Sequence, residues 1–115
     1  MKKLLVTMCM SVFLLAANPA PAQAQGSLTE DMCKHVYTLS DNVMLLRQYG
    51  MPMHEVRAML LTQVDSEIAA DIIKAVISDA YAMPRLHNDD MIQSEATEFA
   101  NKNYRECLLA FGDAT

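Results

Sequence analysis

The sequence contains no tryptophan, and glycine and proline are scarce, at three and four residues out of 115. So little glycine and proline excludes collagen-like and linker-dominated chains, and it disfavours a turn-rich all-β fold. Basic residues are also few, because nine Lys and Arg stand against fourteen Asp and Glu and give a net charge of −5. This acidic balance argues against nucleic acid as a partner. The length suits one small domain.

The first 24 residues have the pattern of a cleavable signal peptide. Two lysines precede an uncharged apolar run over residues 4–17, and a motif of small residues follows. The run has about 14 residues, fewer than the ~20 that a membrane-spanning helix needs. Cleavage after Ala24, or alternatively after Ala22, would leave one mature domain, residues 25–115. We therefore expect a periplasmic or secreted protein.

Removal of this leader changes both the charge and the cysteine content. It takes away two lysines and no acidic residue, so the net charge falls from −5 to −7. Such a domain is repelled by anionic membrane surfaces, and no membrane contact is expected after cleavage. Cys9 leaves with the leader, and Cys33 and Cys107 remain. Two cysteines in an exported chain most simply form one disulfide.

Beyond the leader, apolar residues recur at helical spacing, without a useful stretch of period-two alternation. Start and stop signals divide this part into four expected helices, at about 28–49, 52–63, 66–82 and 90–111. A capping box of Ser27 and Glu30 is expected to start the first helix, and Gly50 to end it in the left-handed conformation. The expected buried faces include Met59 and Ile68.

Short connections between amphipathic helices favour antiparallel neighbours. Cys33 lies near the start of the first helix and Cys107 near the end of the last, so an up-down arrangement places both at one pole. The predicted fold class is therefore all-α, a small four-helix bundle or orthogonal array with one disulfide. A domain of this size buries only ~60–65 % of its surface, so dimerisation is one way to cover the remaining apolar area.

The chain also resembles a recurrent type of small exported bacterial protein that has a cysteine at each end of a helical domain. Four features carry this resemblance: Cys33, Arg47-Gln48-Tyr49-Gly50, Ala80-Tyr81-Ala82-Met83-Pro84-Arg85, and Phe99 through Tyr104 to Cys107. The resemblance implies an exported helical domain, and it brings no established activity from which catalytic residues could be carried over. In size, acidity and its single disulfide the chain is also similar to periplasmic acid-stress chaperones.

One short segment resembles a metal site. Met51, Met53 and His54 could offer two thioethers and an imidazole, which suit Cu(I). The other interpretation is a helix–helix junction in which methionine fills gaps in a small core. His54-Glu55 begins a zinc-protease motif, but position 58 is alanine, so the second imidazole is missing. We predict no resident metal or other cofactor, with these three residues as weak copper ligands.

Catalytic patterns are missing from the sequence. Bridged cysteines cannot act as nucleophiles, and the chain has neither a Cys-x-x-Cys motif nor a nucleophile elbow around a serine. Neighbouring acids such as Asp89 and Asp90 are ordinary at a helix N-terminus, where the macrodipole favours them. The sequence therefore predicts a protein that is not an enzyme.

Residue types that are enriched at protein interfaces gather around two helix ends. Arg47, Tyr81, Met51 and Met53 are predicted to form an interaction patch, because Arg, Tyr and Met are frequent at binding hot spots. The alternative is that Arg47 and Tyr81 join helix ends inside the domain. Asn103 interrupts the apolar stripe of the last helix, either as a buried, hydrogen-bonded amide or as one edge of this patch.

These observations lead to three functional hypotheses. The leading one is a non-enzymatic periplasmic or secreted protein that binds a protein partner, such as an inhibitor, an immunity-like factor or an envelope accessory protein. The second is an acid-stress chaperone, in which loss of carboxylate charge exposes apolar surface. The third is a copper-binding periplasmic protein.

Overall fold

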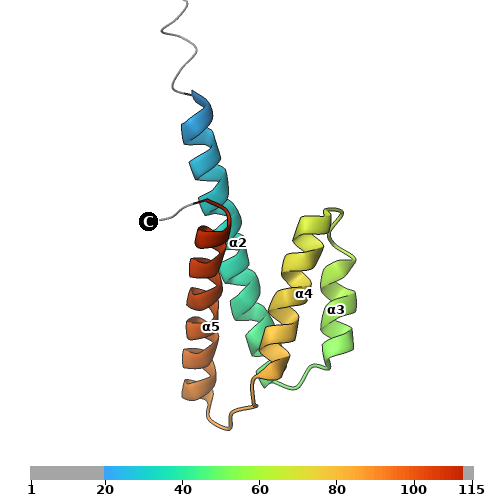
Figure 1. The fold of residues 1–115 in the computed structure, drawn as a ribbon. Helices are drawn as coiled ribbons and strands as arrows, with labels where there is room; N and C mark the ends of the chain where they lie inside the picture. The colour runs from blue at the N-terminus through green and yellow to red at the C-terminus, as the bar shows by residue number, and fades with distance from the viewer. Residues whose placement is uncertain (1–19, 113–115) are drawn as a thin grey trace, which may run out of the picture.

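The structure, a computed structural model, describes the backbone of residues 20–112 and the side chains of residues 28–112 (Figure 1). Most of the predicted leader, residues 1–19, lies outside the described residues, as do residues 113–115. The described part contains four helices and no strand, which confirms the all-α prediction. The helices are α2 (Ala20–Gln48), α3 (Met53–Leu61), α4 (Glu67–Ala82) and α5 (Asp89–Ala110).

Three of the predicted helix boundaries have the expected local chemistry. Gly50, just after α2, has φ +95°, the left-handed conformation that favours glycine. The Ser66 side chain accepts a hydrogen bond from the Ala69 N–H at the start of α4. At the start of α5, Asn88 accepts from the N–H groups of Asp90 and Met91. Local capping signals therefore located these helix ends to within one or two residues.

The predicted start of the first helix is wrong. The backbone is already helical at Ala20, so Ser27 lies inside α2 instead of capping its N-terminus. The preceding segment, residues 20–26, contains three alanines and can continue the helix, because alanine has the highest helix propensity. The capping box at Ser27 therefore does not begin α2 in the uncleaved chain.

The four helices alternate in direction and form an open row. α5 packs antiparallel along α2, α4 packs on another side of α2, and α3 packs mainly on α4 (Figure 1). α2 and α4 run in the same direction and diverge toward their N-terminal ends. The helix axes are roughly aligned, so the arrangement is an up-down array and not an orthogonal one. α2 is its central element.

The core has two parts along α2. The larger cluster contains Val43, Met44, Val56, Ile77 and Phe99, and thereby joins all four helices. The smaller cluster contains Cys33, Val36 and Cys107 and joins α2 to α5. Cys33 and Cys107 lie at disulfide-bonding distance, with their Cα atoms 5.6 Å apart. The predicted cysteine pairing is therefore confirmed.

Helical spacing places Met59, Ile68 and Phe111 on buried faces, but all three are exposed, Phe111 to 41 %. Ile68 is 61 % exposed and Met59 is 41 % exposed. Ile68 lies in the first turn of α4, where α2 and α4 diverge, so no helix covers this side chain. α3 has only nine residues and buries Val56 alone, which leaves Met59 at the surface. The exposure of Ile68 marks the site that is described next.

Within the described residues, no helix combines the length and the apolar character needed to cross a membrane.

Candidate protein-binding site

The divergence of α2 and α4 leaves an apolar hollow, called here the α2–α4 hollow. It has a volume of about 430 Å³. Its lining residues are Met32, His35, Val36 and Leu39 of α2, and Ser66, Ile68, Ala69, Ile72 and Ile73 at the start of α4. Most of these side chains are apolar, and His35 is the single ionisable one among them. The hollow follows about two turns of each helix.

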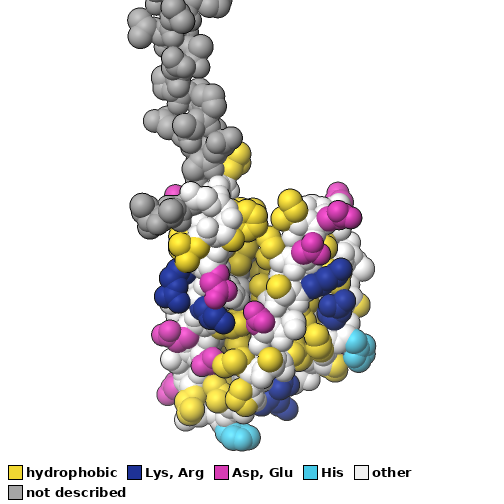
Figure 2. All heavy atoms as spheres, in the orientation of Figure 1, with side chains coloured by type: hydrophobic (Ala, Val, Ile, Leu, Met, Phe, Trp, Pro, Cys, Tyr) yellow, Lys and Arg dark blue, Asp and Glu magenta, His cyan; other side chains and the backbone are white. Residues whose placement is uncertain are grey.

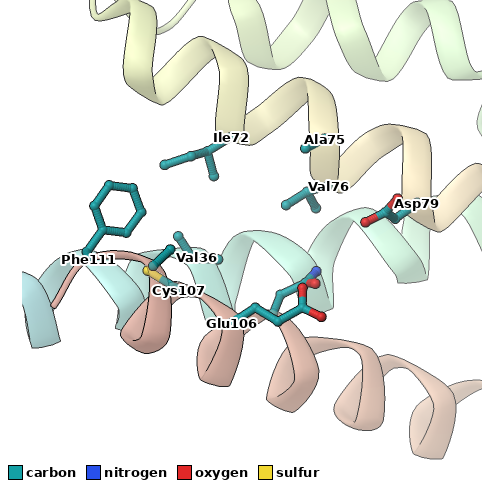
Figure 3. A pocket seen from close by; sticks show the side chains of 10 residues that line it. Val36, Ile72, Ala75, Val76, Asp79, Glu106, Cys107 and Phe111 are labelled. Carbon is teal, nitrogen blue, oxygen red and sulfur yellow. The ribbon is translucent and has the colours of Figure 1, made fainter. Parts of the chain in front are cut away.

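A second hollow lies between α4 and α5, with α2 behind it, and is called here the α4–α5 hollow (Figure 3). Its volume is about 270 Å³. Its lining residues are Val36, Ile72, Ala75, Val76, Asp79, Asn103, Glu106, Cys107, Ala110 and Phe111. Val36 and Ile72 line both hollows, so the two adjoin each other. Together they form one apolar depression to which α2, α4 and α5 all contribute side chains.

Acidic side chains flank the α4–α5 hollow on opposite sides. Asp79 projects from α4 and Glu106 from α5, while Cys107 lies near Val36 and Phe111, farther along the hollow from Asp79 (Figure 3). The space-filling view shows hydrophobic side chains between the two halves of the molecule, with acidic side chains beside them (Figure 2). Among residues 28–112 the one ion pair is Lys34–Glu30, so neither Asp79 nor Glu106 is paired there. Both carboxylates are therefore available to a ligand.

The predicted interaction patch lies elsewhere, at the opposite end of α2. The structure brings three of its four residues together: Arg47 lies 5.3 Å from the centre of the Tyr81 ring, and the Tyr81 hydroxyl donates to the Met51 carbonyl. Nε and Nη2 of Arg47 donate to the Met83 carbonyl at 3.3 and 3.1 Å. Met53 is 38 % exposed and forms none of these bonds. The polar groups of Arg47 and Tyr81 are thus used inside the domain.

Burial also affects the acidity of Tyr81. Desolvation raises the pKa of its hydroxyl above the ordinary value of 10.0. The positive charge of Arg47 opposes this shift, and the negative charge of Glu55 adds to it. The hydroxyl therefore remains a neutral hydrogen-bond donor to Met51 up to strongly alkaline pH.

Gln48 has a structural role that the sequence analysis missed. Its side chain is 1 % exposed, donates from Nε2 to the Pro84 carbonyl at 2.9 Å, and accepts at Oε1 from the Leu86 N–H at 2.7 Å. Arg85 Nε in turn donates to the Gln48 carbonyl at 3.3 Å. These bonds fix the connection between α4 and α5 to the end of α2. The sequence signal for this role is a glutamine on the apolar face of a helix, in its last turn, where a buried amide needs hydrogen-bond partners.

Asn103 is the buried, hydrogen-bonded amide of the two alternatives. It is 7 % exposed, and its Nδ2 donates to Oγ of the fully buried Ser40 at 2.9 Å. This polar pair crosses the α2–α5 interface. Asn103 also lines the α4–α5 hollow, whereas Arg47 and Tyr81 do not.

The possible copper ligands lie at the junction of α2 and α3. Met53 and His54 are exposed in the first turn of α3, and Met51 is half-buried just before it. The Met51 carbonyl accepts the bond from Tyr81, which supports the junction interpretation. Among the described residues, no group of three or more His, Cys, Asp or Glu side chains is arranged to hold a metal ion. Copper binding by the two methionines and His54 stays a prediction.

No family model matches the chain, no curated protein matches it, and no solved structure matches its fold.

Proposed function

We propose that this chain is an exported, non-enzymatic protein that binds another protein through the two adjoining hollows. The observation that carries this proposal is the apolar surface left open where α2 and α4 diverge. Ile68, at 61 % exposure, and Phe111, at 41 %, lie at this surface together with the half-buried Ile72. Contiguous exposed apolar surface on a small domain commonly marks a binding site.

The dimensions of the hollows suit anchoring side chains of a partner. Binding energy at protein interfaces is concentrated in a few apolar or aromatic side chains that fill pockets at the centre of the interface. Hollows of about 270 and 430 Å³ lie at or below the low end of the range for pockets that enclose small ligands. Both are open to the surface, so a partner can insert side chains without rearrangement of the helices.

Export is supported by two independent features. The first 24 residues have the pattern of a signal peptide. Cys33 and Cys107 lie at disulfide-bonding distance, which is typical of proteins in oxidising compartments. An oxidising, extracytoplasmic setting would preserve the bridge beside the α4–α5 hollow, where Cys107 is a lining residue.

The test compares two variants with nearly equal exposure. Ile68→Glu places a charge in the α2–α4 hollow, and Leu109→Glu places the same charge on α5, outside both hollows, where Leu109 is 62 % exposed. Residues 25–115 of both variants and of the natural sequence are crosslinked to extracellular and periplasmic extracts. We expect the same proteins to be captured by the natural sequence and by Leu109→Glu, and to be lost with Ile68→Glu. Equal capture by all three would contradict the proposal, provided that circular dichroism shows all three folded.

The same geometry supports a second candidate, an acid-stress chaperone. The chain has fourteen Asp and Glu against nine Lys and Arg, and carboxylates as a class are largely protonated at about pH 3. The helices would then expose more apolar surface to unfolded clients. This hypothesis predicts increased binding of a hydrophobic dye and suppression of client aggregation at pH 3. Unchanged dye binding between pH 7 and pH 3, without such suppression, would exclude it.

A further inference from the structure

The acidic residues on both sides of the α4–α5 hollow specify the chemistry of what binds there. We propose that this hollow receives a basic amphipathic helix of a partner protein, with apolar side chains in the hollow and Lys or Arg beside Asp79 and Glu106. This inference rests on the proposed function, because it names the class of partner for the same site.

The shape of the hollow favours a helical occupant. Its α4 wall runs from Ile72 to Asp79 and its α5 wall from Asn103 to Ala110, each about two helical turns or ~10 Å long. The walls consist of side chains on helices, and the described residues contain no strand edge that could pair with an extended peptide. A groove between helices is the usual receptor for the apolar face of an amphipathic helix.

Apart from the Asn103 amide, which is bonded to Ser40, the buried side chains that line the hollow are apolar. Val76 is 5 % exposed and Cys107 is 7 % exposed, so these side chains form a firm surface. Ala75 and Ala110 are exposed at the upper edges, and their small side chains leave the hollow open. Only residues with apolar side chains on the facing side would fill this space without leaving unpaired polar groups.

The charge of the flanking residues selects among apolar occupants. Asp79 and Glu106 are exposed, lie on opposite sides of the hollow, and form no ion pair within residues 28–112. Two basic residues of α5, Lys102 and Arg105, line a neighbouring depression with Asp79 and form no ion pair with it there. Of these two depressions, Glu106 lines only the α4–α5 hollow. Its carboxylate is therefore expected to contribute more than Asp79 to the preference of this hollow for a basic ligand. Anionic lipids and acidic helices would be repelled, whereas a basic helix would be attracted.

The test uses two synthetic peptides of about 14 residues with the same leucine and alanine face. One carries lysine and the other glutamate at the positions that flank this face. Binding to residues 25–115 is measured by fluorescence anisotropy in low and high salt. We expect the lysine peptide to bind about tenfold more tightly at low salt, the order of effect for two exposed charge pairs. This preference should shrink at high salt because the charges are screened.

Charge-neutralising variants test whether Asp79 and Glu106 cause the preference for the lysine peptide. Asp79→Asn with Glu106→Gln should reduce binding of the lysine peptide several-fold, and Glu106→Gln alone should account for most of the change. Asp89→Asn with Asp90→Asn is the matched control, because it removes two charges at the far end of α5, outside both hollows. The control should keep the preference for the lysine peptide.

Three results would overturn the inference. Equal binding of both peptides, abolished by Ile68→Glu, would leave an apolar binding site without charge selection and so keep the proposed function. Equal loss of preference in the control variant would mean that net charge, and not this hollow, attracts the peptide. If the protein bound neither peptide but did bind uncharged phosphatidylcholine vesicles, the ligand of the hollow would be a lipid surface and not a helix.

Discussion

Arg47 and Tyr81 form a stacked pair, with the guanidinium carbon of Arg47 lying 5.3 Å from the centre of the Tyr81 ring. The pair joins the C-terminal end of α2 to that of α4, because Arg47 also donates two hydrogen bonds to the Met83 carbonyl. The Tyr81 hydroxyl extends the same connection to Met51, just before α3. Three helix ends are thus held together by two side chains.

The raised pKa of Tyr81 predicts a loss of stability at alkaline pH. The unfolded chain releases the phenolic proton near pH 10.0, while the folded chain retains it to higher pH. The free energy of unfolding is therefore unaffected by this group below pH 10 and falls as the pH rises toward the pKa of the folded state. Denaturation by urea between pH 8 and pH 11.5 measures this fall. It should be smaller in Tyr81→Phe than in the control Tyr49→Phe, whose ring is 58 % exposed. Equal slopes in the two variants would argue against a raised pKa at Tyr81.

Gln48→Ala is expected to destabilise the domain by about 2–3 kcal/mol, because it leaves the Pro84 carbonyl and the Leu86 N–H without their partner. The matched control is Gln93→Ala, on an exposed face of α5, which should change stability by less than about 0.5 kcal/mol. Chemical denaturation measures both. If the two variants were equally stable, the connection between α4 and α5 would not depend on Gln48.

Ser40→Ala is expected to destabilise the domain by about 1–3 kcal/mol, since Nδ2 of Asn103 would lose its acceptor inside the α2–α5 interface. Ser78→Ala, at an exposed position on α4, should be close to neutral. A double-mutant cycle of Ser40→Ala and Asn103→Ala should give a coupling energy of about 0.5 kcal/mol or more. Strict additivity would mean that the two side chains act independently.

Reduction of the Cys33–Cys107 bridge is expected to lower the melting temperature by roughly 10–25 °C. The cysteines are 74 residues apart in the sequence, and closing a loop of that size stabilises a protein by up to about 4.5 kcal/mol in the chain-entropy model. Calorimetry of residues 25–115 with and without reductant measures the change. Thiol titration of unfolded, unreduced residues 25–115 should detect no free thiol. Two free thiols per molecule would contradict the bridge.

The number and approximate extent of the helices could be predicted because local chemistry determines them. Ser66, Asn88 and Gly50 each act through bonds or backbone angles within a few residues, so their effect is visible in the sequence. The start of α2 was mispredicted for the same reason. The capping box at Ser27 predicts a boundary there, although the alanine-containing segment before it continues the helix.

The hollows could not be predicted, because they depend on the angle between helices. Val36 and Ile72 have the spacing of core residues, and Val36 belongs to the smaller core cluster while Ile72 packs against it. Whether such residues are covered depends on where α2 and α4 diverge, which helical periodicity does not encode. Ile68 shows the difference, since the same apolar pattern predicted a buried residue and the structure leaves it exposed.

The role of Arg47 and Tyr81 illustrates a second kind of ambiguity. Both residue types serve equally well in interfaces and in contacts between helix ends, so composition alone left the two interpretations open. In the structure the Arg47 guanidinium donates to the Met83 carbonyl, and the Tyr81 hydroxyl donates to the Met51 carbonyl. Binding of a partner at this patch stays a prediction, with Met53 as its exposed member.

The pairing of α2 with α5 has a consequence for how the chain matures. A chain made and translocated from its N-terminus delivers α2 first and α5 last of the four described helices. In a chain that is exported as proposed, the face of α2 that carries Cys33 and Val36 has no α5 to pack against until Cys107 has crossed the membrane as well. During that interval the apolar face and the free thiol of Cys33 are open to other molecules. Under the proposed export, factors that shield such helices and thiol oxidases that act late would affect how much of the protein reaches its bridged form.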